Sequence, residues 1–160
     1  MKVINKKMNF NEINELIDYL AKLVIKNKKK SICIGLIGDL GTGKTAFAKR
    51  ILSDLGVLCS VKSPTFTFMI EYNLQDLDIV HFDVYRINNE DNLYDIGFYD
   101  YIDAPGLTLI EWANLIPNAL PKNCLFYEIN HDTLDTRFVS IYTMKDGEKN
   151  YVDLNNYNFD

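Results

Sequence analysis

Gly38-Asp39-Leu40-Gly41-Thr42-Gly43-Lys44-Thr45 is the stretch of this chain that decides its fold. It matches the pattern G-x-x-x-x-G-K-[ST] of a phosphate-binding loop, or P-loop. A short apolar run, residues 31–37, precedes the loop as a buried parallel strand would. Residues 46–55 follow with helical spacing, and Gly56 is placed to end the helix. This order of strand, glycine-rich loop and helix predicts an α/β domain.

The residue types of the loop suit the binding of phosphate groups. Glycines let the backbone approach phosphate oxygens closely, and N–H groups at the helix N-terminus point at the anion. Lys44 is expected to reach the β- and γ-phosphates, and the Thr45 hydroxyl to bind Mg²⁺. The nucleotide-binding residues predicted here are Gly38, Asp39, Leu40, Gly41, Thr42, Gly43, Lys44, Thr45 and Ala46. The alternative is a glycine-rich turn that binds no ligand.

The composition indicates one acidic globular domain. The chain has 160 residues, 48% of them hydrophobic, and a formal net charge of −5. We expect a single domain over residues 1–160, with a peripheral tail after about residue 145. No apolar run approaches the ~20 residues that cross a bilayer, and no signal core follows the N-terminus, so we expect a cytoplasmic protein without membrane contact. The acidic charge argues against broad binding to nucleic acid.

The three cysteines form no pattern typical of a metal site. Cys33, Cys59 and Cys124 are widely spaced, contain no C-x-x-C pair and have only two histidines to accompany them. No zinc spacing exists. We therefore expect three reduced thiols, mostly buried.

The rest of the chain predicts a central mixed, largely parallel sheet flanked by helices, with antiparallel hairpin strands. A helix is expected over residues 9–26, because Asn9 and Glu12 have the spacing of a capping box. A second helix, broken near Gly97, is expected over residues 88–102. Strands are expected within residues 62–72 and over 78–86, 107–112, 124–129 and 138–142, with a weak strand near 151–152.

Two acidic residues are candidates for the chemistry. Glu111 ends a buried strand, which is typical of the second P-loop motif and favours a role in holding the metal or polarising the attacking water. Asp83 lies within a strand, so it either faces a wet cleft or pairs with a cation such as Arg86 or Lys62. The Thr65 hydroxyl is a weaker candidate for the Mg²⁺ shell.

Other P-loop classes fit the sequence poorly. The chain has three arginines, few for the cationic lid that a nucleotide kinase builds over its substrates. Residues 103–106 match D-x-x-G, but no convincing apolar strand precedes them, and no N-K-x-D motif is present. Guanine specificity is therefore unsupported.

Four motifs taken together resemble one family. They are the P-loop, S-P-T-F at residues 63–66, H-x-D-x-Y-R at residues 81–86 and I-E-W at residues 110–112. In this order the chain resembles bacterial TsaE, also called YjeE, over about residues 9–142. The resemblance implies a single P-loop domain that binds ATP and Mg²⁺. It also implies work with the TsaD and TsaB subunits, in which ATP hydrolysis resets the complex that makes threonylcarbamoyladenosine next to the tRNA anticodon.

The resemblance also implies roles for particular residues. Thr45 and Glu111 would hold Mg²⁺, residues 63–66 would form a switch-like loop, and Asp83 would be the strand acid. Arg137 would lie near the nucleotide base. A threonine that family members often carry early in the first helix is replaced here by Ile13, so Asn11 is expected to contact the base instead.

The sequence thus predicts a Mg²⁺-dependent ATPase with Lys44, Asp83, Glu111 and Thr65 in the chemistry, either Asp83 or Thr65 ordering the attacking water. Hydrolysis by this chain alone is expected to be slow, because no arginine finger is evident. Contact with tRNA is expected only through the complex. A small-molecule kinase and a non-catalytic nucleotide-sensing adaptor remain the alternatives.

Overall fold

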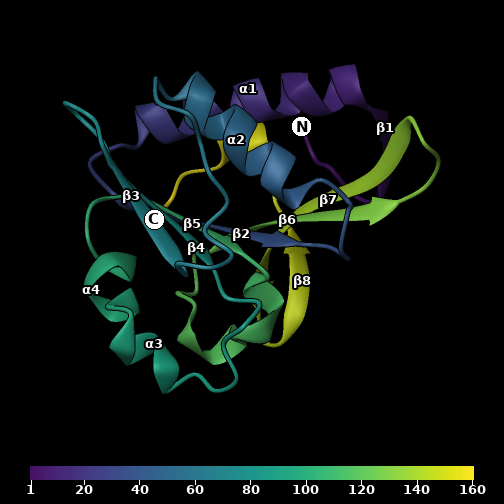
Figure 1. The fold of residues 1–160 in the computed structure, drawn as a ribbon. Helices are drawn as coiled ribbons and strands as arrows, with labels where there is room; N and C mark the ends of the chain where they lie inside the picture. Colours follow the sequence, from purple (N-terminus) through teal and green to yellow (C-terminus); the bar gives the residue numbers. More distant parts are fainter.

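A computed structural model of residues 1–160 shows one eight-stranded sheet with helices on both faces (Figure 1). Along the sheet the strand order is β1-β7-β6-β2-β5-β4-β3, and β8 pairs with the same edge of β7 as β1 does. The strands are β1 (Lys6–Asn9), β2 (Ser31–Ile37), β3 (Met69–Asn73), β4 (Asp78–Asp83), β5 (Gly106–Glu111), β6 (Leu125–His131), β7 (Thr136–Lys145) and β8 (Glu148–Tyr151).

The centre of the sheet is parallel and its edges are antiparallel. β2 pairs in parallel with β5 and β6, and β4 pairs in parallel with β5. β3 and β7 run antiparallel to their neighbours β4 and β6. This confirms the predicted mixed sheet with parallel central strands and hairpin strands.

Two long helices cover one face of the sheet (Figure 1). They are α1 (Phe10–Lys26) and α2 (Lys44–Asp54). The capping box predicted for α1 is present, with the Asn9 side chain accepting from the Glu12 N–H and the Glu12 carboxylate accepting from the Asn9 N–H. α2 begins directly at the P-loop lysine, as the strand–loop–helix pattern requires.

Two short helices, α3 (Asn92–Asp95) and α4 (Phe98–Ile102), cover the opposite face together with short 3₁₀ turns. The helix predicted over residues 88–102 is therefore interrupted, as expected, at Gly97, whose left-handed φ of 72° suits glycine. Its beginning is later than predicted, because residues 88–91 form turns.

Two predicted strands are shorter in the structure. β3 begins only at Met69, because Phe68 has a φ of 64° that breaks the extended run. β4 ends at Asp83, whose carboxylate accepts a hydrogen bond from the Tyr85 N–H and turns the chain. Tyr85 consequently lies outside the strand and is exposed.

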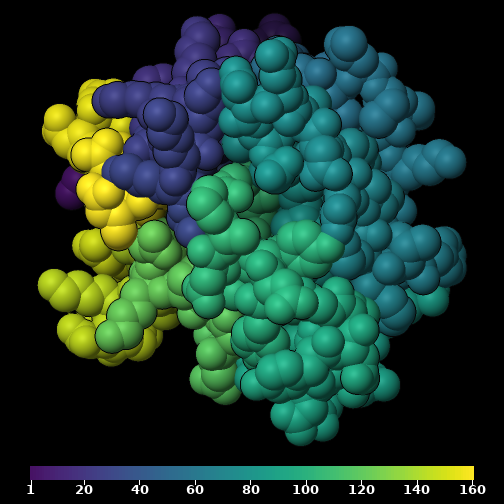
Figure 2. Space-filling view, turned by 90° about the vertical axis from the view of Figure 1, so that its left-hand side faces the viewer, coloured from purple at the N-terminus to yellow at the C-terminus, as the bar shows by residue number.

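The tail after about residue 145 is not peripheral, contrary to the prediction. β8 pairs with β7, and Leu154 and Phe159 are buried in the core that α1 and α2 cover. Lys30 and Asp160 form an ion pair that joins the turn between α1 and β2 to the C-terminus. Figure 2 shows yellow C-terminal residues lying beside the indigo part of the chain.

The cysteines are all free, and two of the three are buried, as expected. Cys33 and Cys124 lie in the core, while Cys59 is exposed. None of the helices combines the length and apolar character needed to cross a membrane.

Candidate functional site

The candidate site lies where the C-terminal ends of three parallel strands meet. Pairing of β4 with β5 puts Asp83 opposite Glu111, and pairing of β2 with β5 puts Leu36, two residues before the P-loop, on the other side of Glu111. Ligands of open α/β sheets gather at such C-terminal ends. The sheet therefore places both predicted carboxylates beside the phosphate loop.

The P-loop curls around the amine of its own lysine. The Lys44 Nζ donates hydrogen bonds to the backbone oxygens of Gly38 and Asp39, the latter at 2.9 Å. The same Nζ lies 4.1 Å from the centre of the Trp112 ring, an arrangement that suits a cation–π contact. Partial burial lowers the pKa of Lys44, although the charges of nearby carboxylates, first that of Glu111, oppose this effect.

Glu111 is held at both carboxylate oxygens. The Thr45 hydroxyl donates to its Oε1 at 2.7 Å, and the His81 Nε2 lies 3.0 Å from its Oε2. Burial by itself would raise the pKa of Glu111, but His81, Thr45 and Lys44 outweigh burial and hold this pKa below its usual value. Glu111 is therefore an ionised carboxylate in direct contact with the P-loop hydroxyl.

Asp83 forms no ion pair and faces the pocket. Its Oδ2 accepts a hydrogen bond from the Thr65 hydroxyl at 3.0 Å, and its Oδ1 accepts one from the Tyr85 N–H at 3.0 Å. Of the two interpretations left open by the sequence, the structure supports a wet cleft rather than a pair with Arg86 or Lys62. Thr65 is the link between the S-P-T-F loop and the strand acid.

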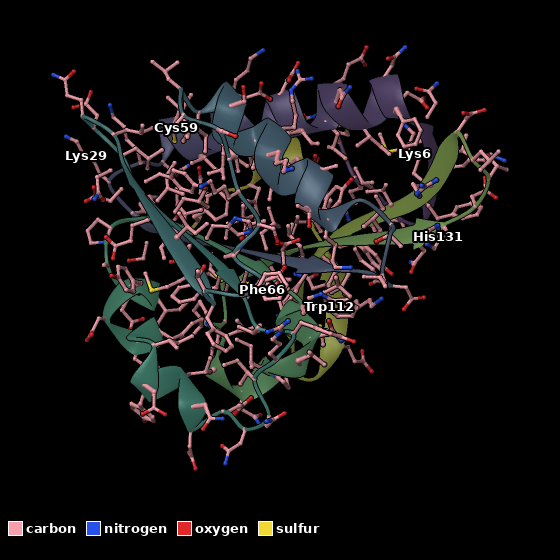
Figure 3. The ribbon with its side chains drawn as sticks, viewed as in Figure 1. Lys6, Lys29, Cys59, Phe66, Trp112 and His131 are labelled. Carbon is pink, nitrogen blue, oxygen red and sulfur yellow. The ribbon has the colours of Figure 1, made fainter.

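A pocket of about 310 Å³ opens between these groups. Figure 3 shows Trp112 and Phe66 below the start of α2 in this region. Trp112 has a left-handed φ of 62°, and its ring packs against that of Tyr85, with centroids 4.7 Å apart and planes tilted by 40°. The residues lining the pocket are Leu40, Gly41, Gly43, Lys44, Thr45, Ala46, Thr65, Asp83, Tyr85, Glu111 and Trp112.

Arg137 reaches the P-loop from β7. Its Nε donates to the backbone oxygen of Thr42 at 3.0 Å, and its guanidinium lies 5.3 Å from the centre of the Phe10 ring. A smaller cavity of about 80 Å³ adjoins the loop here, lined in part by Ile13 and Asn14. Asn11 is exposed and lines neither this cavity nor the larger pocket, so its predicted contact with the nucleotide base stays a prediction.

The donors beside the pocket suit a metal ion shared with a phosphate. No cluster of three or more His, Cys, Asp or Glu side chains is arranged to hold a metal alone. Mg²⁺ in nucleotide sites typically takes one or two protein oxygens, substrate phosphates and waters. The Thr45 hydroxyl and the Glu111 carboxylate, 2.7 Å apart at the pocket, fit that donor set.

Sequence reasoning did not foresee two partners of the predicted residues. His81 lies within hydrogen-bond distance of Glu111, and the Trp112 ring lies against the Lys44 amine. The alternation of β4 was the available signal, because it puts His81 and Asp83 on the same face of the strand. That the two side chains lie near Glu111 could not be predicted, because it depends on the register of β4 on β5.

Comparison with known proteins identifies the family. The model of the family "Threonylcarbamoyl adenosine biosynthesis protein TsaE" matches residues 9–139. The chain belongs to the TsaE family. A TsaE protein of Bacillus subtilis is 38% identical over 136 residues, which cover 84% of this chain and 85% of that protein. A TsaE protein of Haemophilus influenzae is 33% identical over 133 residues, covering 82% and 84% of the two chains.

A solved structure has the same fold. The crystal structure of Bacillus subtilis YdiB superposes with a TM-score of 0.62 at 32% sequence identity, covering 88% of this chain and 86% of that one. Both TsaE relatives are named for tRNA threonylcarbamoyladenosine biosynthesis. Membership in the TsaE family places this chain among the proteins of that biosynthesis.

Proposed function

We propose that this TsaE family member binds ATP with Mg²⁺ in the P-loop pocket and hydrolyses it. The observation that carries the proposal is the 2.7 Å hydrogen bond from the Thr45 hydroxyl to Glu111. It joins the last residue of the phosphate loop to the carboxylate that ends β5. P-loop NTPases hold their metal ion with such a pair, a loop hydroxyl and a strand acid. The pocket beside this pair also contains Lys44 and Asp83.

The polar residues in and beside the pocket have proposed tasks. The N–H groups at the start of α2 and the Lys44 amine bind phosphate oxygens, for which Lys44 exchanges its present bonds to backbone oxygens of the loop. Thr45 and Glu111 hold Mg²⁺, which when bound neutralises charge on the phosphates. Asp83, with Thr65 hydrogen-bonded to it, orients the attacking water. Arg137 supports the loop on the side of the base.

Hydrolysis by the isolated chain is expected to be slow. An arginine finger contributes about 10³–10⁵ to the rate in related phosphoryl transfers. Arg86, the arginine of the motif H-x-D-x-Y-R, lies over the Phe66 ring and does not line the pocket. A partner that completes the site would raise the rate, and we propose the TsaD and TsaB subunits in the cytoplasm as that partner, with tRNA contacted only through them.

The proposal is tested by phosphate release from ATP and from GTP. The chain is assayed alone and with the TsaB–TsaD pair, and Lys44→Ala serves as the control that lacks the phosphate-binding amine. Strong stimulation by the pair, preference for ATP and loss of activity in Lys44→Ala are expected. Nucleotide binding without stimulation or phosphate release would instead favour a nucleotide-sensing adaptor. Transfer of phosphate from ATP to a metabolite without the pair would favour a kinase.

A further inference from the structure

A buried histidine lies behind the carboxylate that the proposed function assigns to Mg²⁺. His81 is in the middle part of β4, and its side chain is 0% exposed. Its Nε2 lies 3.0 Å from Oε2 of Glu111, and its Nδ1 has no hydrogen-bond partner. Because His81 does not line the pocket, it cannot touch the nucleotide, and Glu111 is the polar side chain that it contacts.

The direction of this hydrogen bond follows from the chemistry of the two groups. The oxygens of an ionised carboxylate only accept hydrogen bonds, so the Nε2 of His81 carries a hydrogen and donates a hydrogen bond to Oε2. Oε1 accepts from the Thr45 hydroxyl. Each oxygen of Glu111 therefore has one fixed donor, one from a strand beside it and one from α2.

Glu111 depends on such donors more than an aspartate would. A glutamate has one more rotatable bond than an aspartate, and its side-chain freedom must be removed for the oxygens to keep one direction. The carboxylate of Asp83 lies opposite Glu111 on the neighbouring strand, so an unanchored Glu111 would also approach a second negative charge. The donor on His81 keeps Oε2 directed into the protein and leaves Oε1 facing Thr45.

We propose that His81 is a positioning residue for the metal site, because it fixes the Glu111 carboxylate on the side of Thr45. The inference rests on the proposed function, since it concerns the response of the nucleotide site to Mg²⁺. Groups that orient metal-binding side chains typically change metal affinity or activity about 10- to 100-fold when they are removed. A histidine that merely filled space in the core would leave the response to Mg²⁺ unchanged.

Two amide variants separate these roles with matched chemistry. In His81→Gln the side-chain N–H₂ takes the place of the His81 Nε2, whereas in His81→Asn it takes the place of Nδ1, which faces no partner. Thr108→Val changes another buried polar residue of the central sheet, on β5, and serves as the control for general damage. Where His81→Asn fails to fold, His81→Leu replaces it as a variant that fills the space without a donor.

The measurement is the affinity of the full-length chain for ADP by calorimetry, in EDTA and at rising Mg²⁺, with phosphate release from ATP measured over the same range. We expect His81→Asn to bind ADP in EDTA as the wild type does. It should need Mg²⁺ concentrations at least about 10-fold higher than the wild type for the same gain in affinity and for the same rate of phosphate release. His81→Gln and Thr108→Val should keep the wild-type requirement.

The outcomes separate this inference from its premise. If neither the ADP affinity nor the phosphate release of the wild type responds to Mg²⁺, the proposed function is wrong and the inference is overturned with it. If the wild type responds and His81→Asn needs no more Mg²⁺ than the wild type, only the role of His81 is overturned. Equal losses in His81→Gln and His81→Asn would also overturn it, because the position of the donor would then not matter.

Discussion

The hydrogen bond between Thr45 and Glu111 can be removed with almost no change of shape. Thr45→Val replaces the hydroxyl by a methyl group of similar size. In the structure the Thr45 hydroxyl is the donor to Oε1 of Glu111, and the Glu111 side chain is almost completely buried. The substitution therefore leaves one oxygen of an ionised, buried carboxylate without its protein partner.

The size of the effect follows from the charge on Glu111. Hydrogen bonds to charged groups contribute about 1.5–3 kcal/mol to stability. We take the low end, about 1.5 kcal/mol, because Glu111 lines the open pocket and water can replace part of the lost bond. For a domain of 160 residues this corresponds to a fall in Tm of about 3–6 °C.

The assay is thermal denaturation of Thr45→Val and Thr45→Ser, each alone, with ADP and with ADP and Mg²⁺. The valine variant should show the lower Tm and should gain stability from ADP, but it should lose the additional gain from Mg²⁺. The serine variant keeps the hydroxyl and should resemble the wild type in both respects. A valine variant as stable as the wild type, with an undiminished gain from Mg²⁺, would refute the reasoning.

Three further predictions concern other parts of the molecule. Gly106→Ala should lower the free energy of unfolding by about 2 kcal/mol or more in denaturant titrations. The reason is that the added Cβ would lie 2.3 Å from the backbone oxygen of Asp78, at a φ of +120°. A stability within error of the wild type would contradict this. Because the folded-state pKa of Glu111 is lowered, its stabilisation is present above the unfolded pKa of about 4.3 and is lost as the pH falls through the folded value. The difference in free energy of unfolding between wild type and Glu111→Gln should therefore be constant near neutrality and shrink below about pH 4; a constant difference down to pH 3 would contradict this. Arg137→Ala removes a donor to the P-loop oxygen of Thr42 and should weaken ATP binding about fivefold in a titration; unchanged affinity would separate Arg137 from the site.

Local patterns were enough to predict the central part of this fold. The strand that precedes the P-loop lies over residues 31–37 as predicted, and α1 begins with the predicted capping box. Both features depend on neighbouring residues, namely a run of apolar side chains and a pair of capping groups three residues apart. The strand that ends in Glu111 was predicted for the same reason.

Features that depend on distant contacts were not predictable in this way. β1 is four residues long and mostly polar, and only its pairing with β7 makes it a strand. The tail after about residue 145 was predicted to be peripheral, yet its Leu154 and Phe159 fill the core under α1. Likewise, alternation placed His81 and Asp83 on one face of β4, but the contact of His81 with Glu111 depends on the register between strands.

The most direct test of the account is equilibrium binding of ATP in the presence of Mg²⁺ to the wild type and to Lys44→Ala. The Lys44 amine is the cation at the bottom of the P-loop, so its loss should weaken binding about 10-fold or more, equivalent to one hydrogen bond to a charged group. Such a loss, with the fold intact by thermal denaturation, would establish the P-loop pocket as the nucleotide site. Equal affinity of the two proteins for ATP would contradict the account.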